Sequence, residues 1–511
     1  MKRLIIGEGA YGCVHKPSIH CTTPPNPGFD YKNYVSKIMK TKNAQKELEE
    51  FVIIGKLDPT NEYHLGEPIL CKPQLVEENI KSAISKCKHI NFSDIEAHPD
   101  NYSLLVLKFG GPDLKALSNE YLTKYLETDK EQRVDTFWLE VHHLLKGLKF
   151  FKDNGIVHND IKPQNILFNL TDGKMKYIDF GLMRPKKEVI NSSKTNKNYL
   201  GVYHWSYPFD CGLMNNQQFN NYFRRKPNRR LFWKDQLSEL IVADSNVNSL
   251  NLPINNPKSF SILFTYLNPN NTIPTTATQY GYIDSFFDGF DELIKTKSYD
   301  TVLNDITDSI DVFGLGFTLQ FMANSFKQLN ALSLEQFTRL STFFHKMYDF
   351  NPSTRIIDID ALLNEYENIL LEIGVLTRLK KSFQNNILVN KPPASPVIME
   401  QSKNDEKSKS KSNSNSKHLS VELQEFANKD ATEIATKIVT KICPEGKEIN
   451  PNTNRCVKKC ASGFSRGRNF KCYSTKKRTR KISSKSKSKS KSRSRSINSN
   501  SSKTTSKTLI Y

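Results

Sequence analysis

Long hydrophobic runs are absent from this sequence of 511 residues. No stretch approaches the roughly 18 consecutive apolar residues that a bilayer-spanning helix requires. The apolar run Leu4–Ile6 near the N-terminus is too short to form the core of a secretory signal. We therefore expect a soluble, intracellular protein that enters neither a membrane nor the secretory pathway.

An excess of positive charge is absent from most of the chain. Residues 1–380 contain 44 Lys and Arg and 44 Asp and Glu, so their formal charge is zero. Residues 381–511 contain 30 basic and 9 acidic residues and carry the entire net charge of +21. This asymmetry argues against one uniformly basic nucleic-acid binder and indicates a near-neutral globular body with a basic appendage.

Cysteine is sparse in the neutral body, where five cysteines are scattered along the sequence. This distribution is typical of reduced intracellular thiols, and we expect that state for Cys13, Cys21, Cys71, Cys87 and Cys211. Histidines of the body carry no evident metal pattern. We expect solvated side chains at His15 and His20, and surface or boundary positions on a helix for His142 and His143.

Apolar runs of strand length characterise the first part of the chain. Strands are predicted at Leu4–Ile6, Tyr34–Met39 and Leu104–Phe109, with a helix at Ala44–Leu57. A helical body follows, in which apolar residues recur at helix spacing over 137–151 and further helices are predicted at 310–323, 333–348 and 359–380. Residues 211–300 interrupt this regularity and are predicted to form a large insertion with some helical content.

The composition changes to Ser, Lys, Asn and Pro after about residue 376, and such a segment buries too little apolar area to order itself. We predict a disordered linker over 377–418, an amphipathic helix over 419–442, a small cysteine-containing module over 443–473 and a disordered Ser/Lys/Arg-rich tail over 474–511. The module holds Cys443, Cys456, Cys460 and Cys472. Their spacing contains no Cys-x₂-Cys knuckle, which favours disulfides or free thiols over a zinc site without excluding zinc.

A glycine-rich turn follows the first predicted strand. Gly7, Gly9 and Gly12 lack a Cβ atom, so the backbone of this turn can approach phosphate oxygens closely. By itself the pattern is weak, since most glycine-rich turns are only turns.

Two further motifs place four polar residues at characteristic intervals. The loop His158–Asn165 contains Asp160, Lys162 and Asn165, which can supply a proton acceptor, a phosphate contact and a metal ligand. Asp179, in an Asp-Phe-Gly sequence, follows Asn165 after room for one hairpin, so both oxygen ligands can share one Mg²⁺ ion.

These motifs, in this order, resemble the eukaryotic-type protein kinase family over about residues 1–375. The resemblance implies an α+β, bilobal protein kinase fold with a β-rich N-lobe at 1–109 and a helical C-lobe at 110–376. It implies Mg-ATP as the cofactor and protein substrates that accept phosphate on Ser or Thr. Lys162, two residues after Asp160, matches the serine/threonine form of the loop.

The resemblance assigns the nucleotide site residue by residue. Gly7, Gly9 and Gly12 would cover the phosphates and Val14 the adenine, while Lys37 would contact the α- and β-phosphates. Glu47 is the favoured partner of Lys37, and Glu50, with nearly the same pattern, is the alternative.

The segment after the third predicted strand resembles the kinase hinge. Leu107 would be the gatekeeper residue, Phe109 and Gly110 would present backbone groups to adenine, and Asp113 would lie near the ribose.

The same resemblance assigns the chemical centre and its supports. Asp160 would be the catalytic base, Lys162 would steady the transferred phosphoryl group, and Asn165 and Asp179 would hold Mg²⁺. Structural roles are implied for Asp311, which would tie down the catalytic loop, and for Arg355, which would pair with Asp210 at the end of the activation segment.

The sequence departs from the common kinase pattern at two places. Asn159 stands where many kinases carry an arginine that pairs with a phosphorylated activation loop, so we predict activity that does not require this phosphorylation. Tyr207–Asp210 replaces the usual Ala-Pro-Glu. The aromatic run 199–209 is expected to pack beneath a substrate groove.

Other features resemble kinases encoded by large cytoplasmic DNA viruses. These are the opening from Gly7 to Pro17, the helix end Lys56–Pro59 and the segment Cys443–Cys456, which is similar to a two-cysteine adaptor module of such viruses. The resemblance implies a viral protein of the host cytoplasm or the virion.

Two alternatives remain at this point. The chain could be a pseudokinase scaffold, or its function could reside in the basic tail as an arm that binds nucleic acid, an acidic partner or the virion. We expect a monomer without a membrane partner.

Overall fold

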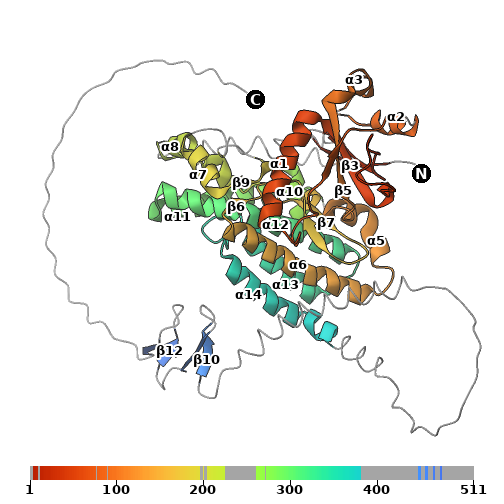
Figure 1. Cartoon of the computed structure of the whole chain (residues 1–511). Coiled ribbons are helices and arrows are strands. Elements are labelled where there is room, and N and C mark those ends of the chain that lie inside the picture. The colour runs from red at the N-terminus through yellow and green to blue at the C-terminus, as the bar shows by residue number, and fades with distance from the viewer. Residues whose placement is uncertain are drawn as a thin grey trace, which may run out of the picture. The chain divides into compact units, whose positions relative to one another are not determined.

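The computed structural model describes residues 4–9, 12–75, 78–88, 90–195, 200, 204–224, 260–270 and 272–380, and four short strands between residues 447 and 474. The chain divides into two compact units, Met1–Thr436 and Lys437–Tyr511. Figure 1 shows a sheet-containing N-terminal part and a helical part within the first unit. Among the described residues, no helix is both long and apolar enough to cross a membrane.

The N-terminal part is built on one antiparallel sheet of five strands in the order β1-β2-β3-β5-β4. The strands are β1 (Leu4–Gly9), β2 (Gly12–Lys16), β3 (Tyr34–Lys40), β4 (Ile69–Cys71) and β5 (Tyr102–Lys108). Buried apolar residues on these strands include Ile38 and Leu104, which face each other across β3 and β5. The three predicted strands are therefore confirmed, with slightly different ends.

Helix α1 (Thr41–Leu57) packs beside this sheet and buries Phe51 and Ile54 (Figure 1). Smaller elements complete the N-terminal part and its junction with the helical part. They are η1 (Tyr31–Asn33), α2 (Glu78–Ile84), α3 (Phe92–Ala97), η2 (Pro99–Asn101), α4 (Leu114–Ala116), η3 (Leu117–Tyr121) and α5 (Leu122–Tyr125).

The helical part is centred on α12 (Tyr299–Gln328), whose residues from Ser309 to Phe326 are all buried. Its other long helices are α6 (Lys130–Asp153), α11 (Thr276–Thr296), α13 (Leu334–Tyr348) and α14 (Ile359–Glu372). A Cβ atom on Gly314 of α12 would lie 2.4 Å from the carbonyl oxygen of Ile161, so glycine is required where α12 meets the 158–165 loop. The helices predicted in this part are confirmed, although α12 is longer and α14 shorter than expected.

Short elements connect these helices and form the surroundings of the candidate site. They are β6 (Ile156–Val157), η4 (Pro163–Asn165), β7 (Ile166–Phe168), β8 (Met175–Tyr177), η5 (Phe180–Leu182), β9 (Arg184–Pro185), α7 (Lys186–Lys194) and η6 (Phe209–Leu213). The predicted insertion contributes α8 (Asn216–Arg224), α10 (Ser261–Leu267) and α11. Its residues 225–259 lie outside the described residues.

The second unit contains two antiparallel hairpins. The first pairs β10 (Lys447–Asn450) with β11 (Arg455–Lys458), and the second pairs β12 (Phe464–Arg466) with β13 (Cys472–Ser474). Cys456 lies on β11, whereas Cys443 and Cys460 lie outside the described residues. The predicted linker (377–418, apart from its first four residues), the helix at 419–442 and the tail after 474 also lie outside them.

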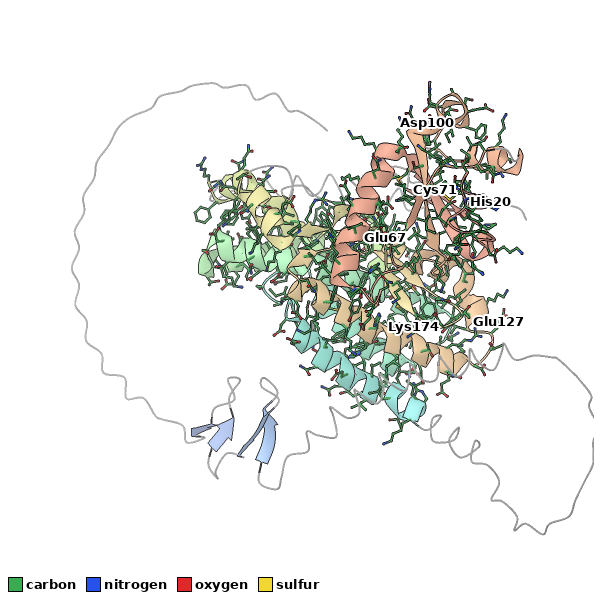
Figure 2. The ribbon with its side chains drawn as sticks, viewed as in Figure 1. His20, Glu67, Cys71, Asp100, Glu127 and Lys174 are labelled. Carbon is green, nitrogen blue, oxygen red and sulfur yellow. A yellow bond between two sulfur atoms is a disulfide. The ribbon has the colours of Figure 1, made fainter. Side chains whose placement is uncertain are left out.

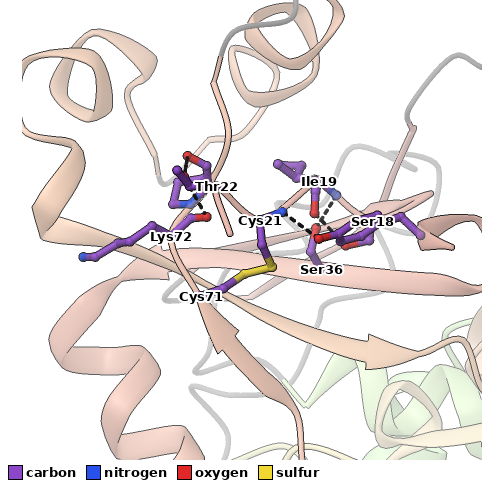
Figure 3. The surroundings of a disulfide bond; sticks show 9 residues. Ser18, Ile19, Cys21, Thr22, Ser36, Cys71 and Lys72 are labelled. Atoms are coloured by element: carbon purple, nitrogen blue, oxygen red, sulfur yellow. Dashed lines mark hydrogen bonds between the residues drawn. A yellow bond between two sulfur atoms is a disulfide. The ribbon is translucent and has the colours of Figure 1, made fainter. Parts of the chain in front are cut away.

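Four cysteines of the N-terminal part form disulfides, so the expectation of reduced thiols was wrong for them. Cys13 is bonded to Cys87 and Cys21 to Cys71, while Cys211 is free and buried. Figure 3 shows the surroundings of the second pair, where hydrogen bonds join the segment after β2 to β3 and to the residue that follows β4. The backbone N–H of Ile19 donates to Ser36 Oγ (2.8 Å) and the hydroxyl of Thr22 to the Lys72 carbonyl. Cys71 appears among the side chains of this part in Figure 2.

These two cross-links generate the first prediction. They close sequence separations of 74 and 50 residues, so each constrains the unfolded chain, and removing one should cost about 2–4 kcal/mol. Reductant should lower the temperature of thermal unfolding of wild type, and Cys21→Ser should lower it without reductant. Cys211→Ser is the matched control, in which the effect of reductant should persist. Alkylation of Cys13 and Cys87 in the folded protein without reductant would contradict the pairing.

Candidate functional site

A carboxylate on α12 binds the backbone of the 158–165 loop. Asp311 accepts the backbone N–H of His158 through Oδ2 (2.7 Å) and that of Asn159 through Oδ1 (2.9 Å). Asn159 has a φ of 64°, a left-handed conformation that asparagine tolerates better than most residues. Burial raises the pKa of Asp311 to about 7, and the two N–H donors oppose this rise. The loop thus depends on a side chain more than 150 residues further along the chain.

Within this loop, Asp160, Lys162 and Asn165 form one hydrogen-bonded group. Lys162 Nζ donates to both carboxylate oxygens of Asp160, each at 2.8 Å. Asn165 Nδ2 donates to the carbonyl oxygen of Asp160 and to its Oδ2, again at 2.8 Å. Burial raises the pKa of Asp160, whereas Lys162 lowers it. These hydrogen bonds fix the rotamer of the buried Asp160 carboxylate, and the ammonium of Lys162 lies beside it.

The residue before Asp179 connects it to this group through a backbone hydrogen bond. The N–H of Ile178 donates to the Asn165 carbonyl oxygen (3.0 Å), and Asp179 itself has a left-handed φ of 62°. Its negative charge raises the pKa of Asp160 and that of Lys37. The carboxylate of Asp179 is therefore near both the loop and the sheet.

Lys37 on β3 forms an ion pair with Glu47 on α1, with 2.6 Å between Nζ and Oε2. Burial alone would lower the pKa of Lys37, but the carboxylates of Glu47, Asp179 and Glu50 outweigh it and raise this pKa. The ammonium in turn opposes the rise that burial imposes on the pKa of Glu47. Glu50, which is buried on the same helix, affects Lys37 through its charge, and burial raises the pKa of Glu50 to about 7.

Aromatic rings join α1 to the 158–165 loop. The ring of Phe180 lies 6.1 Å from that of Phe51 on α1 and 4.9 Å from that of His158 (centroid distances). Burial lowers the pKa of His158 to about 4, so this ring is neutral. These ring contacts connect the helix that carries Glu47 with the loop that carries Asp160.

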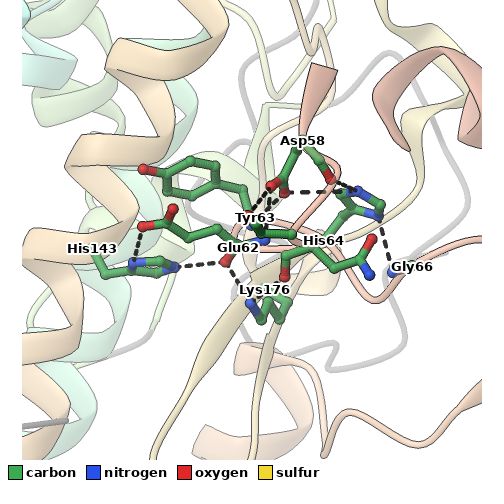
Figure 4. Close-up of polar contacts among 9 residues, drawn as sticks. Asp58, Glu62, Tyr63, His64, Gly66, His143 and Lys176 are labelled. Carbon is green, nitrogen blue, oxygen red and sulfur yellow. Dashed lines mark hydrogen bonds and ion pairs between the residues drawn. The ribbon is translucent and has the colours of Figure 1, made fainter. Parts of the chain in front are cut away.

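A polar network anchors the C-terminal end of α1 (Figure 4). Asp58 accepts the N–H groups of Glu62 (2.9 Å) and Tyr63 (2.8 Å) through its carboxylate. The carbonyl oxygen of Glu62 accepts hydrogen bonds from His143 Nε2 (3.0 Å) and from the ammonium of Lys176. The turn after α1 is therefore fixed to α6 and β8, which belong to the helical part.

The histidines near these networks were placed wrongly from the sequence. His142 and His143 are buried on α6, and His15 is buried on β2, whereas His20 is partly buried. Burial lowers the pKa of His143 to about 3 because the ring packs against Tyr63 with Lys176 nearby. A helix that is covered on most faces, such as α6, does not reveal its buried histidines by apolar periodicity.

The glycine-rich hairpin β1–β2 lies beside β3 in the same sheet, with Val14 of β2 opposite Lys37 of β3. A Cβ atom on Gly12 would lie 2.2 Å from the carbonyl oxygen of Ile38, so the close approach of β2 to β3 requires glycine there. Gly9 pairs with Gly12 at the end of the hairpin, and Gly7 pairs with Val14.

The segment after β5 leads from the sheet to the helical part. The ammonium of Lys16 lies 3.0 Å from the ring centroid of Phe109, whose N–H donates to the Asn33 carbonyl oxygen (2.9 Å). Gly110 follows, and Asp113 caps α4 by accepting the N–H of Ala116 (2.8 Å). Burial raises the pKa of Asp113, and this capping bond opposes it.

Polar contacts hold the described residues of the segment from Asp179 to Asp210. Asn159 Nδ2 donates to the Leu182 carbonyl oxygen at 3.0 Å. Two ion pairs then fasten α7 to α12, Lys186 to Asp308 and Lys194 to Asp300. The position of Asn159, which sequence comparison marks only as a missing arginine, therefore has a contact of its own.

The end of this segment is fixed by a buried ion pair. Arg355 Nη1 lies 2.9 Å from Asp210 Oδ2, and the exposed fractions of the two side chains are 1% and 0%. The same nitrogen donates to Ser309 Oγ (3.0 Å), and Nε donates to the Asp349 carbonyl oxygen (2.8 Å). Aspartate at position 210 thus contacts Arg355 directly although its side chain is shorter than glutamate.

Asn165 and Asp179 have the donor chemistry of a magnesium site. The amide nitrogen of Asn165 is engaged by Asp160, which leaves its oxygen Oδ1 for a cation, and Asp179 contributes a carboxylate. Mg²⁺ prefers such oxygen ligands and commonly takes only one or two from the protein. Among the described residues, no cluster of three or more His, Cys, Asp or Glu is arranged for a metal.

Comparisons with known proteins find similarity to protein kinases. Residues 2–208 match the family model described as the protein kinase domain. This stretch, which holds the five-stranded sheet and the first part of the helical region, is similar to protein kinase domains.

Similar curated proteins are serine/threonine kinases by name. Serine/threonine-protein kinase ppk23 of Schizosaccharomyces pombe is 28% identical over 191 residues, which are 37% of this chain and 38% of that protein. SSK22 of Saccharomyces cerevisiae is 33% identical over 95 residues, 19% of this chain and 6% of that protein. A protein of Acanthamoeba polyphaga mimivirus with a serine/threonine-protein kinase/receptor name is 41% identical over 63 residues, 12% of this chain and 4% of that protein. The chain thus spans well under half of the length of these relatives.

The buried ion pair generates the second prediction. Because Arg355→Ala leaves the Asp210 carboxylate buried without its cation, it should lower the free energy of unfolding by about 3–5 kcal/mol. Lys149→Ala is the control, since it removes the exposed pair with Asp153 and should cost less than about 1 kcal/mol. Chemical denaturation of the full chain measures both values, and equal losses would contradict a special role for the buried pair.

Proposed function

We propose that this protein is a serine/threonine protein kinase that transfers the γ-phosphate of ATP to Ser or Thr hydroxyl groups of protein substrates. The observation that carries the proposal is the convergence of Lys37, Asp160, Asn165 and Asp179, from both parts of the fold, on one region. The kinase-domain match and the names of the relatives support the same activity.

The protein's own groups would act mainly by positioning and by neutralising charge. Asp160 would accept the hydroxyl proton of the acceptor, and its raised pKa suits a proton acceptor better than an exposed aspartate would. Lys162, now paired with Asp160, would steady the transferred phosphoryl group. Lys37, kept charged by Glu47, would contact the α- and β-phosphates beneath the backbone of Gly7, Gly9 and Gly12.

The adenine and the metal would occupy the remaining parts of this region. Val14 would lie over the adenine, the backbone at Phe109 and Gly110 would contact its edge, and Asp113 would lie near the ribose. Asn165 and Asp179 would hold Mg²⁺, which supplies charge neutralisation for the phosphates when it is bound.

The structural residues have supporting contacts. Asp311 would keep the catalytic loop in place through two backbone N–H groups, and Arg355 with Asp210 would fix the end of the activation segment. The mimivirus relative supports a viral origin, for which the host cytoplasm or the virion would be the site of action.

Two alternatives differ in measurable ways. A pseudokinase scaffold would bind partners without turnover, but no catalytic position assigned from the resemblance is replaced. A tail that binds nucleic acid or an acidic partner could coexist with kinase activity, and the net charge of residues 381–511 favours it.

Loss of the base tests the activity itself. Asp160→Asn should lower phosphate transfer to a serine/threonine peptide library by about 10²–10⁴-fold, because a positioned general base contributes that much. Lys37→Met should abolish transfer. Asp153→Asn, the same change on the exposed end of α6, is the matched control and should retain wild-type activity. Full activity of either active-site variant would refute the assignment.

The hydrogen bond from Asn159 to the Leu182 carbonyl oxygen supports the prediction that the activation segment would not require phosphorylation. Phosphatase treatment should therefore leave the initial rate unchanged, with complete removal of phosphate checked by mass spectrometry. Asn159→Ala should lower the rate about five-fold, since it removes the hydrogen bond to the Leu182 carbonyl oxygen. A rate that falls on dephosphorylation and recovers on rephosphorylation would contradict this prediction.

A further inference from the structure

Helix α10, in the segment predicted to be an insertion, is built into the helical part beside α12 (Figure 1). Its Tyr266 is only 6% exposed, and its ring centroid lies 4.5 Å from that of Phe321 on α12. Asn324 of α12 donates through Nδ2 to the carbonyl oxygens of Tyr266 (2.9 Å) and Asn268 (3.0 Å). The end of α10 therefore has a fixed position relative to α12.

The hydroxyl of Tyr266 reaches the 158–165 loop. Gln164 Nε2 donates to this hydroxyl at 3.1 Å. Gln164 belongs to η4, directly before Asn165 and four residues after Asp160. Helix α10 is thus hydrogen-bonded to the loop at Gln164, the residue before the proposed metal ligand Asn165.

Tyr266 also contacts the end of the activation segment. Its ring lies edge-on to that of Trp205, with 6.1 Å between the centroids, and Trp205 belongs to the aromatic run expected beneath a substrate groove. Burial raises the pKa of Tyr266, and the charge of Asp113 adds to this rise. One side chain therefore adjoins both the loop and the activation segment.

Two anchors hold the loop at different points. Asp311 binds the backbone N–H groups before Asp160, whereas Tyr266 binds the side chain that follows it, at Gln164. In the proposed reaction the acceptor hydroxyl must approach Asp160, and Gln164, on the same loop, is only partly buried, whereas Trp205 is buried and packs against Tyr266. A shift of Gln164 would change the loop beside Asp160 while leaving the contacts of Lys37 intact.

We propose that Tyr266 is a positioning residue for the protein acceptor, which it affects by fixing Gln164 and the adjoining Trp205. This inference rests on the proposed kinase activity and extends it to the 211–300 segment. In this scheme the segment helps to build the acceptor side of the site, and substrate choice depends on a residue outside the kinase motifs.

The experiment measures steady-state kinetics with one peptide, the best acceptor that wild type selects from a serine/threonine library. Tyr266→Phe keeps the ring and removes the hydroxyl, so the KM for the peptide should rise about five-fold, the effect of one neutral hydrogen bond. The KM for ATP should change less than about two-fold. Gln164→Ala should raise the peptide KM similarly, and the double variant should show no further increase because both changes remove one interaction.

A matched control separates positioning from stability. Tyr299→Phe removes a hydroxyl that donates to the Met214 carbonyl oxygen (3.2 Å), and it should leave the peptide KM unchanged. Thermal unfolding shows whether any variant is merely destabilised. If wild type transfers phosphate but Tyr266→Phe has an unchanged peptide KM, or if the two single effects simply add, this inference is wrong while the kinase assignment stands. If wild type transfers no phosphate, both fail.

Discussion

The structure depends on one charged interaction, the binding of two backbone N–H groups by the Asp311 carboxylate. The loop from His158 to Asn165 has little regular structure, so its shape must be imposed from outside. Hydrogen bonds to an ionised carboxylate contribute about 1.5–3 kcal/mol each, more than neutral bonds do, so this support is strongest above the pKa of about 7 that burial gives Asp311. Gly314, one helical turn further along α12, allows the loop to lie directly on the helix. The arrangement of Asp160 and Asn165 follows from this support.

A second constraint joins the sheet to the helical part. The ion pair between Lys37 and Glu47 positions α1 at one end, and the Asp58 network fixes its other end to α6 and β8. Phe180 lies between, in contact with α1 and the loop. These contacts join residues of both parts of the fold, so the sheet and the 158–165 loop are positioned relative to each other by the chain itself.

Local motifs made much of this architecture predictable, whereas long-range contacts did not. The strands, α1 and the long helices follow from apolar periodicity and from Gly, Asp and Pro at their ends. Spacing alone left Glu47 and Glu50 as alternatives, because both face inward on α1, and only three-dimensional packing distinguishes their contacts. The disulfide between Cys13 and Cys87 was missed for the same reason, since nothing near either residue in the sequence indicates its partner.

The nucleotide side of the site can be predicted from the sequence more fully than the acceptor side. The groups expected to contact nucleotide lie within short motifs, so their chemistry can be inferred from spacing. The acceptor side combines Gln164 with Trp205 and Tyr266, the last of which lies about 100 residues away in an interval without a recognisable pattern. A sequence of this kind therefore indicates the class of reaction more readily than the substrate, because substrate contacts are assembled from segments that only the fold brings together.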